Sequence, residues 1–216
     1  MPQTRTLGAV VFEDFELLDL YGPLEMFGNI GPELAIVTVA QEAGPVRSAQ
    51  GPRTVADYAF SDAPELDLVL LPGGYGTFEQ AQNPAMLEFL RRNANAEIVM
   101  SVCSGSGVLA AAGLLDGRRA TSNKLFFDAI TQVSTNVNWE RSARWVEDGS
   151  VFTSSGVSAG TDMSLGVIEK IYGTGRARDI AVMTEYEWQA DPDNDAFAAY
   201  INEGDLPKYL EVLGKA

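Results

Sequence analysis

The chain has 216 residues, 46% of them hydrophobic, which is enough to bury the core of one α/β domain, and its 30 acidic and 15 basic side chains give a formal net charge of −15. That charge repels phosphate backbones and anionic lipid surfaces, so it argues against nucleic-acid and membrane partners. A single cysteine excludes an internal disulfide, and the absence of histidine excludes both a Cys-His hydrolase triad within the chain and a Cys/His metal cluster.

Short β-rich apolar runs alternate with helical patterns through the first half of the chain. Strands are predicted at residues 7–12, 34–41, 66–71 and 97–102, and helices at residues 19–27, from about 84, and at 104–117. Asp19 would cap the first helix, and Gly22–Pro23 would fall in its first turn, where proline is tolerated. Turn residues between short alternating runs over 44–60 predict a β-hairpin excursion at one edge of the sheet.

The second half of the chain continues the alternation. It predicts a short strand near Ala120–Thr121, a hairpin that turns at Asp148–Gly149, and helices over residues 124–133, 158–173 and 176–186. From Glu187 we expect an extended acidic tail, with a short helix over 205–214, whose charges lie on a solvated surface. Alternating strands and helices predict one domain over residues 1–216 with a three-layer, mostly parallel α/β sheet and a core of about 7–186.

Three features that are far apart in the chain fall at the same predicted edge of the sheet, where parallel α/β folds bind ligands. Asp19 follows the first strand, Gly73–Gly74 ends the third, and Cys103 stands between the fourth strand and the helix after it. A strand-nucleophile-helix turn needs small neighbours, which residues 104–107 supply. The positive end of that helix is expected to lower the pKa of the thiol. Together the three features predict a thiol-dependent active site.

Each feature also has a structural explanation that the sequence leaves open. Cys103 can be an inert core residue, Gly73–Gly74 an ordinary tight turn rather than a pair of oxyanion donors, and Asp19 only a helix cap. If Cys103 reacts, a carboxylate must handle the protons, because the chain has no histidine. Asp19 is the first candidate for that role. Asp162 is a weaker one and suits a capping or structural role better.

The glycine-rich segments do not match known cofactor loops. GGYGTFE lacks the Gly-Lys-Ser/Thr ending of a phosphate loop. GSGVLAAAG approximates dinucleotide spacing, but an acidic ribose partner is not found at the expected distance. We therefore expect no cofactor and no metal, and a small molecule as the substrate. The start of the chain lacks the apolar core of a signal peptide and no run reaches the length of a membrane span, which predicts a cytoplasmic protein.

Three segments resemble the DJ-1/PfpI superfamily: LLPGGYG, SVCSGSGVLAAAGLLDGRRAT and EDGSVFTSSGVSAGTDMSL. The likeness covers about Leu7 to Tyr186. It is strongest to the branch that holds isocyanide (isonitrile) hydratases and the amino-terminal domains of some AraC-type regulators. The segment VVFEDFELLDLYGPLEMF is also similar, and it puts Asp19 at the position of the acid in isocyanide hydratases.

The resemblance implies a flavodoxin-like (class I glutamine amidotransferase-like) sandwich, a cysteine elbow with a strained backbone, a homodimer and no cofactor. For the hydratases it implies a lyase reaction in which water adds to R–N≡C and gives an N-formamide. Carried over to this chain, the Cys103 thiolate attacks the terminal carbon, Asp19 protonates it to give a thioimidate, and Asp19 then assists the addition of water. Ser104 would tune the site by hydrogen bonding, and backbone N–H groups near Gly74 would line the pocket.

The chain departs from its relatives in ways that bear on specificity. Protease-like members place a histidine directly after the cysteine, whereas this chain has Ser104, so peptidase activity is not expected. Many members of the branch read RATTHW where this chain reads RATSNK, which puts Asn123 in place of a histidine and leaves the substrate open. Regulators of the branch carry a further helix-turn-helix domain, for which we expect no room in a chain that ends at Ala216.

Two other functions remain open for such a site. One is a glyoxalase- or deglycase-like enzyme that acts on α-oxoaldehydes, which would also use a thiolate and a carboxylate. The other is a non-catalytic redox sensor or small-molecule binder in which Cys103 is oxidised to a sulfenic or sulfinic acid.

Overall fold

Continuous apolar runs form the centre of the sheet, because strands covered by helices on both faces are apolar at nearly every position. The computed structural model describes residues 4–199 and 206–212. In it seven strands form one sheet in the order β10-β11-β7-β6-β1-β2-β5. Their bounds are Arg5–Val10 (β1), Leu34–Ala40 (β2), Tyr58–Ala59 (β5), Leu68–Leu71 (β6), Ile98–Ser101 (β7), Trp145–Asp148 (β10) and Val151–Ser154 (β11).

Every pair of neighbouring strands in this sheet is parallel except β10 and β11, whose antiparallel hairpin turns at Asp148–Gly149 as predicted. The central order β2-β1-β6-β7-β11 is the flavodoxin-like arrangement, with the chain reversing its direction of progress across the sheet between β1 and β6. The fold class predicted from the sequence, a flavodoxin-like α/β sandwich, is therefore confirmed.

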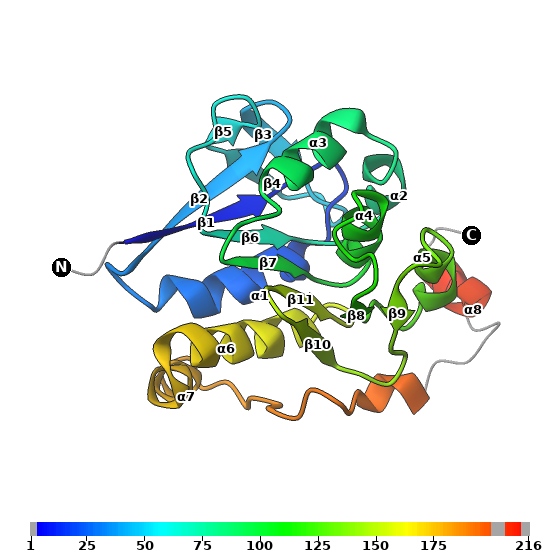
Figure 1. The fold of residues 1–216 in the computed structure, drawn as a ribbon. Coiled ribbons are helices and arrows are strands. Elements are labelled where there is room, and N and C mark those ends of the chain that lie inside the picture. The colour runs from blue at the N-terminus through cyan, green and yellow to red at the C-terminus, as the bar shows by residue number, and fades with distance from the viewer. Residues whose placement is uncertain (1–3, 200–205, 213–216) are drawn as a thin grey trace.

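Helices cover both faces of the sheet. Figure 1 shows α1, α6 and α7 below it, and α3 and α4 above it. The helices are Leu17–Gly28 (α1), Thr77–Gln80 (α2), Pro84–Arg92 (α3), Gly105–Ala111 (α4), Phe127–Thr131 (α5), Ala159–Tyr172 (α6), Thr174–Met183 (α7) and Leu206–Val212 (α8), with a 3-10 turn at Ala196–Ala199. Within the described residues, none of these helices is long and apolar enough to cross a lipid bilayer.

Two small ribbons stand outside the main sheet. The hairpin excursion predicted over residues 44–60 forms an antiparallel pair, β3 (Gly44–Arg47) with β4 (Arg53–Ala56), before β5 rejoins the main sheet. The strand expected near Ala120–Thr121 is β8 (Arg119–Ala120), which pairs with β9 (Asn138–Trp139).

Four predicted helices have different limits, among them α7, which spans Thr174–Met183 rather than residues 176–186. Helix α1 begins at Leu17, so Asp19 lies in its first turn and is not its cap, and Pro23 lies inside the helix rather than in the first turn. Helix α4 ends at Ala111 and not at residue 117, because Gly113 adopts a positive φ that stops the helix. Helix α5 begins only at Phe127, and Leu125 and Phe126 before it form part of the wall of a pocket described below.

The acidic tail packs against the body of the protein, which corrects the expectation of a wholly solvated segment. The backbone oxygen of Pro192 accepts hydrogen bonds from Arg144 N (2.7 Å) and Trp145 N (3.2 Å), and Asp195 N donates to Ser142 O (2.8 Å). Asp195 itself is 3% exposed. The remaining acidic residues of 200–205, and residues 213–216, lie outside the described part of the chain.

Candidate active site

The three predicted features meet at the carboxyl ends of adjacent parallel strands. Asp19 follows β1, Gly73 follows β6 and Cys103 follows β7, on the side of the sheet where the strand order reverses. Gly73 N donates a hydrogen bond of 2.9 Å to Asp19 Oδ2, and Gly74 N donates one of 3.0 Å to Ser104 Oγ. The convergence that the sequence predicts is therefore present as direct contacts.

Cys103 occupies a strained turn. Its φ is +58°, a left-handed conformation that costs energy in any residue with a Cβ. The turn is held by its own backbone: Cys103 N donates to Ser154 O and Ser155 O (3.2 Å each), and Cys103 O accepts from Ser106 Oγ (3.1 Å) and Ser122 Oγ (3.0 Å). The strained elbow that the family resemblance implies is confirmed, and the side chain is 6% exposed.

Glycine at position 105 is required by the closeness of this turn to β6. A Cβ there would lie 2.7 Å from both Leu71 O and Pro72 O, which are backbone atoms that cannot move aside. The same crowding explains Gly73, where a Cβ would lie 2.5 Å from Ser104 Oγ and 3.0 Å from Asp19 Oδ2. The small residues noted in the sequence thus let three backbones approach one another.

Asp19 is fully buried although it carries a titratable carboxyl group. Oδ2 accepts the Gly73 N–H, whereas Oδ1 accepts no well-formed hydrogen bond from the described residues. Burial raises the pKa of this carboxyl well above its usual range, and the hydrogen bonds from Gly73 N–H and the Cys103 thiol oppose that rise only in part. Asp19 is therefore a buried acid within reach of the thiol, not a helix cap.

The Gly73–Gly74 pair does not offer free oxyanion donors, which corrects that expectation. One N–H holds Asp19 and the other holds Ser104, so both are already committed inside the protein. Gly74 does line the pocket, as predicted. Ser104 Oγ also shares a 2.9 Å hydrogen bond with Thr77 Oγ1, so Ser104 links the cysteine turn to the start of α2.

The pKa of Cys103 is raised, not lowered as the position of the helix predicts. Burial is the largest cause, followed by the charge of Asp19. Hydrogen bonding from the Ser104 backbone, the Asn123 side chain and the Val157 backbone stabilises the thiolate and opposes the rise. Because burial raises the pKa of both groups and the charge of Asp19 raises the pKa of the thiol further, the pair favours states that keep at least one proton.

Val157 is the residue at this site that the sequence analysis missed. It is β-branched yet has a φ of +42°, and it directs its backbone toward the Cys103 sulfur. The available signal was that SSGVS follows β11, the strand next to β7, so its residues had to reach the same edge of the sheet.

A pocket of about 420 Å³ opens onto the cysteine. Its walls include Tyr75, Phe78, Leu125 and Phe126, together with Gly74, Ser104, Asn123 and Val157 around the sulfur. The ring of Phe126 makes edge contacts with Tyr75 and with Phe78, at centroid distances of 6.3 and 6.4 Å. The Glu16 carboxylate is the charged group in the lining. Such a pocket suits an apolar group with a small reactive end at Cys103.

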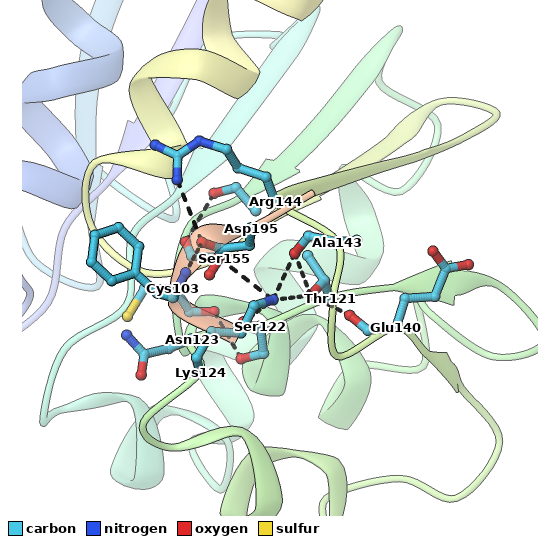
Figure 2. Close-up of polar contacts among 12 residues, drawn as sticks. Cys103, Thr121, Ser122, Asn123, Lys124, Glu140, Ala143, Arg144, Ser155 and Asp195 are labelled. Atoms are coloured by element: carbon cyan, nitrogen blue, oxygen red, sulfur yellow. Dashed lines mark hydrogen bonds and ion pairs between the residues drawn. The ribbon is translucent and has the colours of Figure 1, made fainter. Parts of the chain in front are cut away.

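A buried cluster of charges lies behind the segment that carries Asn123. Lys124 Nζ donates to Ala143 O (2.6 Å) and Thr121 Oγ1 (3.0 Å) and lies 3.8 Å from Asp195 Oδ2. Arg144 pairs with Asp162 and lies 3.6 Å from Asp195 Oδ1. Figure 2 shows Asp195 between the two cations, with Cys103 beside Asn123. Asp162 accepts from Arg144, Tyr186 and the Gln189 backbone, which supports the structural role for it.

Burial, with smaller contributions from Arg141 and Arg144, lowers the pKa of Lys124 from 10.5 to about 8, while Asp195 opposes the shift. Between these two pKa values the unfolded chain holds a proton that the folded protein has lost, so the free energy of unfolding should rise with pH from about 8 to 10.5. The rise from this one group is at most about 3 kcal/mol.

We expect chemical denaturation at pH 8 and pH 10 to show a smaller rise in the free energy of unfolding for Lys124→Met than for the wild type. Equal rises in the two proteins would contradict a lowered pKa for Lys124.

Comparison with known proteins agrees with this architecture. The family model described as the DJ-1/PfpI family matches residues 7–170. A crystal structure of a ThiJ/PfpI family protein from Pseudomonas syringae superposes with a TM-score of 0.83 at 31% identity, covering 99% of this chain and 88% of the other.

Two relatives carry activities in their names. Isonitrile hydratase of Pseudomonas putida is 33% identical over 181 residues, which is 83% of this chain and 78% of the relative. A glutathione-independent glyoxalase of Caenorhabditis elegans is 24% identical, over 68% of this chain and 78% of the relative. With a family model that matches most of its length and an elbow cysteine at the predicted strand end, the chain belongs to the DJ-1/PfpI family.

Proposed function

We propose that this protein is a cofactor-free lyase that adds water to an isocyanide, R–N≡C, and releases the N-formamide, R–NH–CHO. The observation that carries the proposal is the pairing of two buried groups: the elbow thiol of Cys103, which lines the pocket, and the Asp19 carboxyl, whose charge acts on that thiol and whose Oδ1 is uncommitted among the described residues. The similarity to isonitrile hydratase of Pseudomonas putida supports the choice of substrate.

The first half of the reaction uses the shared proton of the pair. In the reactive form the proton resides on Asp19, and the hydrogen bonds from Ser104, Asn123 and Val157 hold the thiolate. The sulfur attacks the terminal carbon of the isocyanide, and Asp19 gives its proton to that carbon. The product is a thioimidate, R–N=CH–S–Cys103, and Asp19 is left as a carboxylate. The raised pKa of Asp19 suits it to donate a proton near neutral pH.

The second half returns the proton. The Asp19 carboxylate accepts a proton from water as the oxygen adds to the thioimidate carbon and passes it to the nitrogen, which gives R–NH–CH(OH)–S–Cys103. Asp19 then takes the hydroxyl proton as the carbonyl forms. The carbon–sulfur bond then breaks, the formamide leaves, and Cys103 and Asp19 again hold one proton between them. One water is consumed for each isocyanide, so atoms and charge balance without a cofactor.

The wall of the pocket supports substrates with an apolar body. Three aromatic rings and Leu125 form one side, and the charge of Glu16 disfavours an anionic group near the mouth. Aryl and alkyl isocyanides meet both conditions. Small polar α-oxoaldehydes, the substrates of the alternative glyoxalase function, leave most of a cavity of about 420 Å³ without favourable contacts.

The test is turnover by the purified protein across a panel of neutral aryl and alkyl isocyanides, with the formamide identified by mass spectrometry. We expect formamide from the larger apolar members of the panel. A panel without any turnover would overturn the hydratase proposal. Lactate formed from methylglyoxal in a Cys103-dependent way would favour the glyoxalase function instead, and oxidation of Cys103 at low peroxide without turnover of either substrate would favour a redox sensor.

A further inference from the structure

The buried cluster behind the pocket is not used by the proposed reaction, yet it connects the C-terminal segment with both segments that hold the cysteine. Asp195 is the member that comes from the C-terminal segment, and its side chain is 1% exposed. It faces Lys124 at 3.8 Å and Arg144 at 3.6 Å. The cluster buries four charged side chains, those of Lys124, Arg144, Asp162 and Asp195, and burying charges is costly, so it must serve either the fold or the site.

One chain of contacts from Asp195 to Cys103 runs through Lys124. Its ammonium donates to Thr121 Oγ1 (3.0 Å) and lies 3.5 Å from Ser122 O, and Ser122 Oγ in turn donates to Cys103 O (3.0 Å). Asn123 stands between Ser122 and Lys124 in the chain, and its side chain lies beside the Cys103 sulfur, where it stabilises the thiolate (Figure 2). The position of the Lys124 ammonium therefore fixes the segment from which Asn123 reaches the sulfur.

A second chain of contacts from Asp195 to Cys103 runs through Arg144. Its backbone oxygen accepts a hydrogen bond of 2.8 Å from Ser155 N, and Ser155 O accepts one from Cys103 N at 3.2 Å. Figure 2 shows Asp195 next to both Arg144 and Lys124, with Ser155 and Ser122 near Cys103. The two segments that support the strained cysteine thus share one carboxylate as their common partner.

We propose that Asp195 is a positioning residue for Cys103, which clamps the segments 121–124 and 144–155 together through Lys124 and Arg144 so that Asn123 stays beside the thiolate. This inference rests on the proposed role of Cys103 as a nucleophile, but not on the identity of the substrate. Asp195 touches no reacting atom and acts only through the residues it holds.

The test measures the thiolate directly. Cys103 is the single cysteine, so its alkylation by iodoacetamide as a function of pH reports its reactivity without any isocyanide. In Asp195→Asn we expect alkylation at pH 7 to be roughly tenfold slower and the midpoint of the pH profile to move upward, because a hydrogen bond to the thiolate is weakened. A protein that hydrates no isocyanide still gives this result, so failure of the proposed function and failure of the clamp are distinguishable.

The matched control is Asp193→Asn, which removes the same charge two residues earlier at an exposed position. If Asp195→Asn and Asp193→Asn have the same alkylation rate and pH profile, the clamp is overturned.

Should Asp195→Asn fail to fold by circular dichroism, the double variant Lys124→Met with Asp195→Leu takes its place, since removing both members of a buried pair leaves neither charge uncompensated. Arg144 remains paired with Asp162 in that variant. If Cys103 is alkylated more slowly in the double variant than in the wild type, the clamp is supported. If the rate equals that of the wild type, the clamp is overturned.

Discussion

Replacing Cys103 by serine will reduce isocyanide hydration by at least roughly 10⁴-fold, because a hydroxyl ionises far less readily than a thiol and Asp19 must keep its own proton for the attack step. Serine is close in size and can keep the backbone contacts of the elbow, which pass through N–H and C=O rather than through the side chain. The fold should therefore survive while the nucleophile is lost. The measurement is kcat/KM on the best isocyanide of the panel, with the thermal unfolding midpoint as the check on folding.

Ser101→Ala is the matched control for that variant. Ser101 lies on β7 two residues before the cysteine, and its buried hydroxyl has no hydrogen-bond partner among the described residues. Removing the hydroxyl should leave activity within a fewfold of the wild type and cost little stability. Substantial turnover by Cys103→Ser, with Ser101→Ala unchanged, would exclude covalent catalysis by Cys103.

The meeting of Asp19, Gly73 and Cys103 could be predicted from sequence because it depends on local patterns and one topological rule. Each of the strands β1, β6 and β7 is a short apolar run with a clear end, and parallel strands bring their carboxyl ends to one edge. Distance along the chain does not matter for such a prediction. Gly73 and Cys103 stand just beyond their strands, and Asp19 lies in the first turn of the helix that follows β1.

The direction of the thiol pKa could not be predicted in the same way. The sequence shows the start of a helix after Cys103, but not that the thiol is buried beside a carboxylate. Helix α4 has 7 residues, and the effect of its positive end is smaller than the combined cost of burial and of the Asp19 charge. Burial depends on tertiary structure, so the local sequence pattern predicted the wrong direction for the pKa shift of Cys103.

The partners of Asp195 were also beyond prediction. Its segment has neither helical nor alternating periodicity, and the abundance of acidic residues favoured a solvated tail. Lys124 and Arg144 lie about 70 and 50 positions earlier and become its partners only once β8, β10 and the tail have folded together. The one local hint was Lys124 itself, a lone cation before the apolar run LFF.

Asp19→Asn is expected to separate ionisation of the thiol from catalysis. Asparagine keeps the size of the side chain and an oxygen that can accept the Gly73 N–H, but it cannot transfer a proton. We expect kcat/KM for isocyanide hydration to fall by roughly 10²- to 10⁴-fold, the usual range for loss of a general acid or base. The measurement is again formamide production, with Glu25→Gln, an exposed carboxylate on the same helix, as the control.

The same variant should make Cys103 easier to ionise. The charge of Asp19 raises the pKa of the thiol, so its removal lowers that pKa and moves the alkylation profile with iodoacetamide to lower pH. A more reactive thiol combined with slower turnover can arise only if Asp19 supplies protons to the substrate. If turnover instead rises together with alkylation, Asp19 merely restrains the thiol, and the proton at the isocyanide carbon must come from water that enters the pocket.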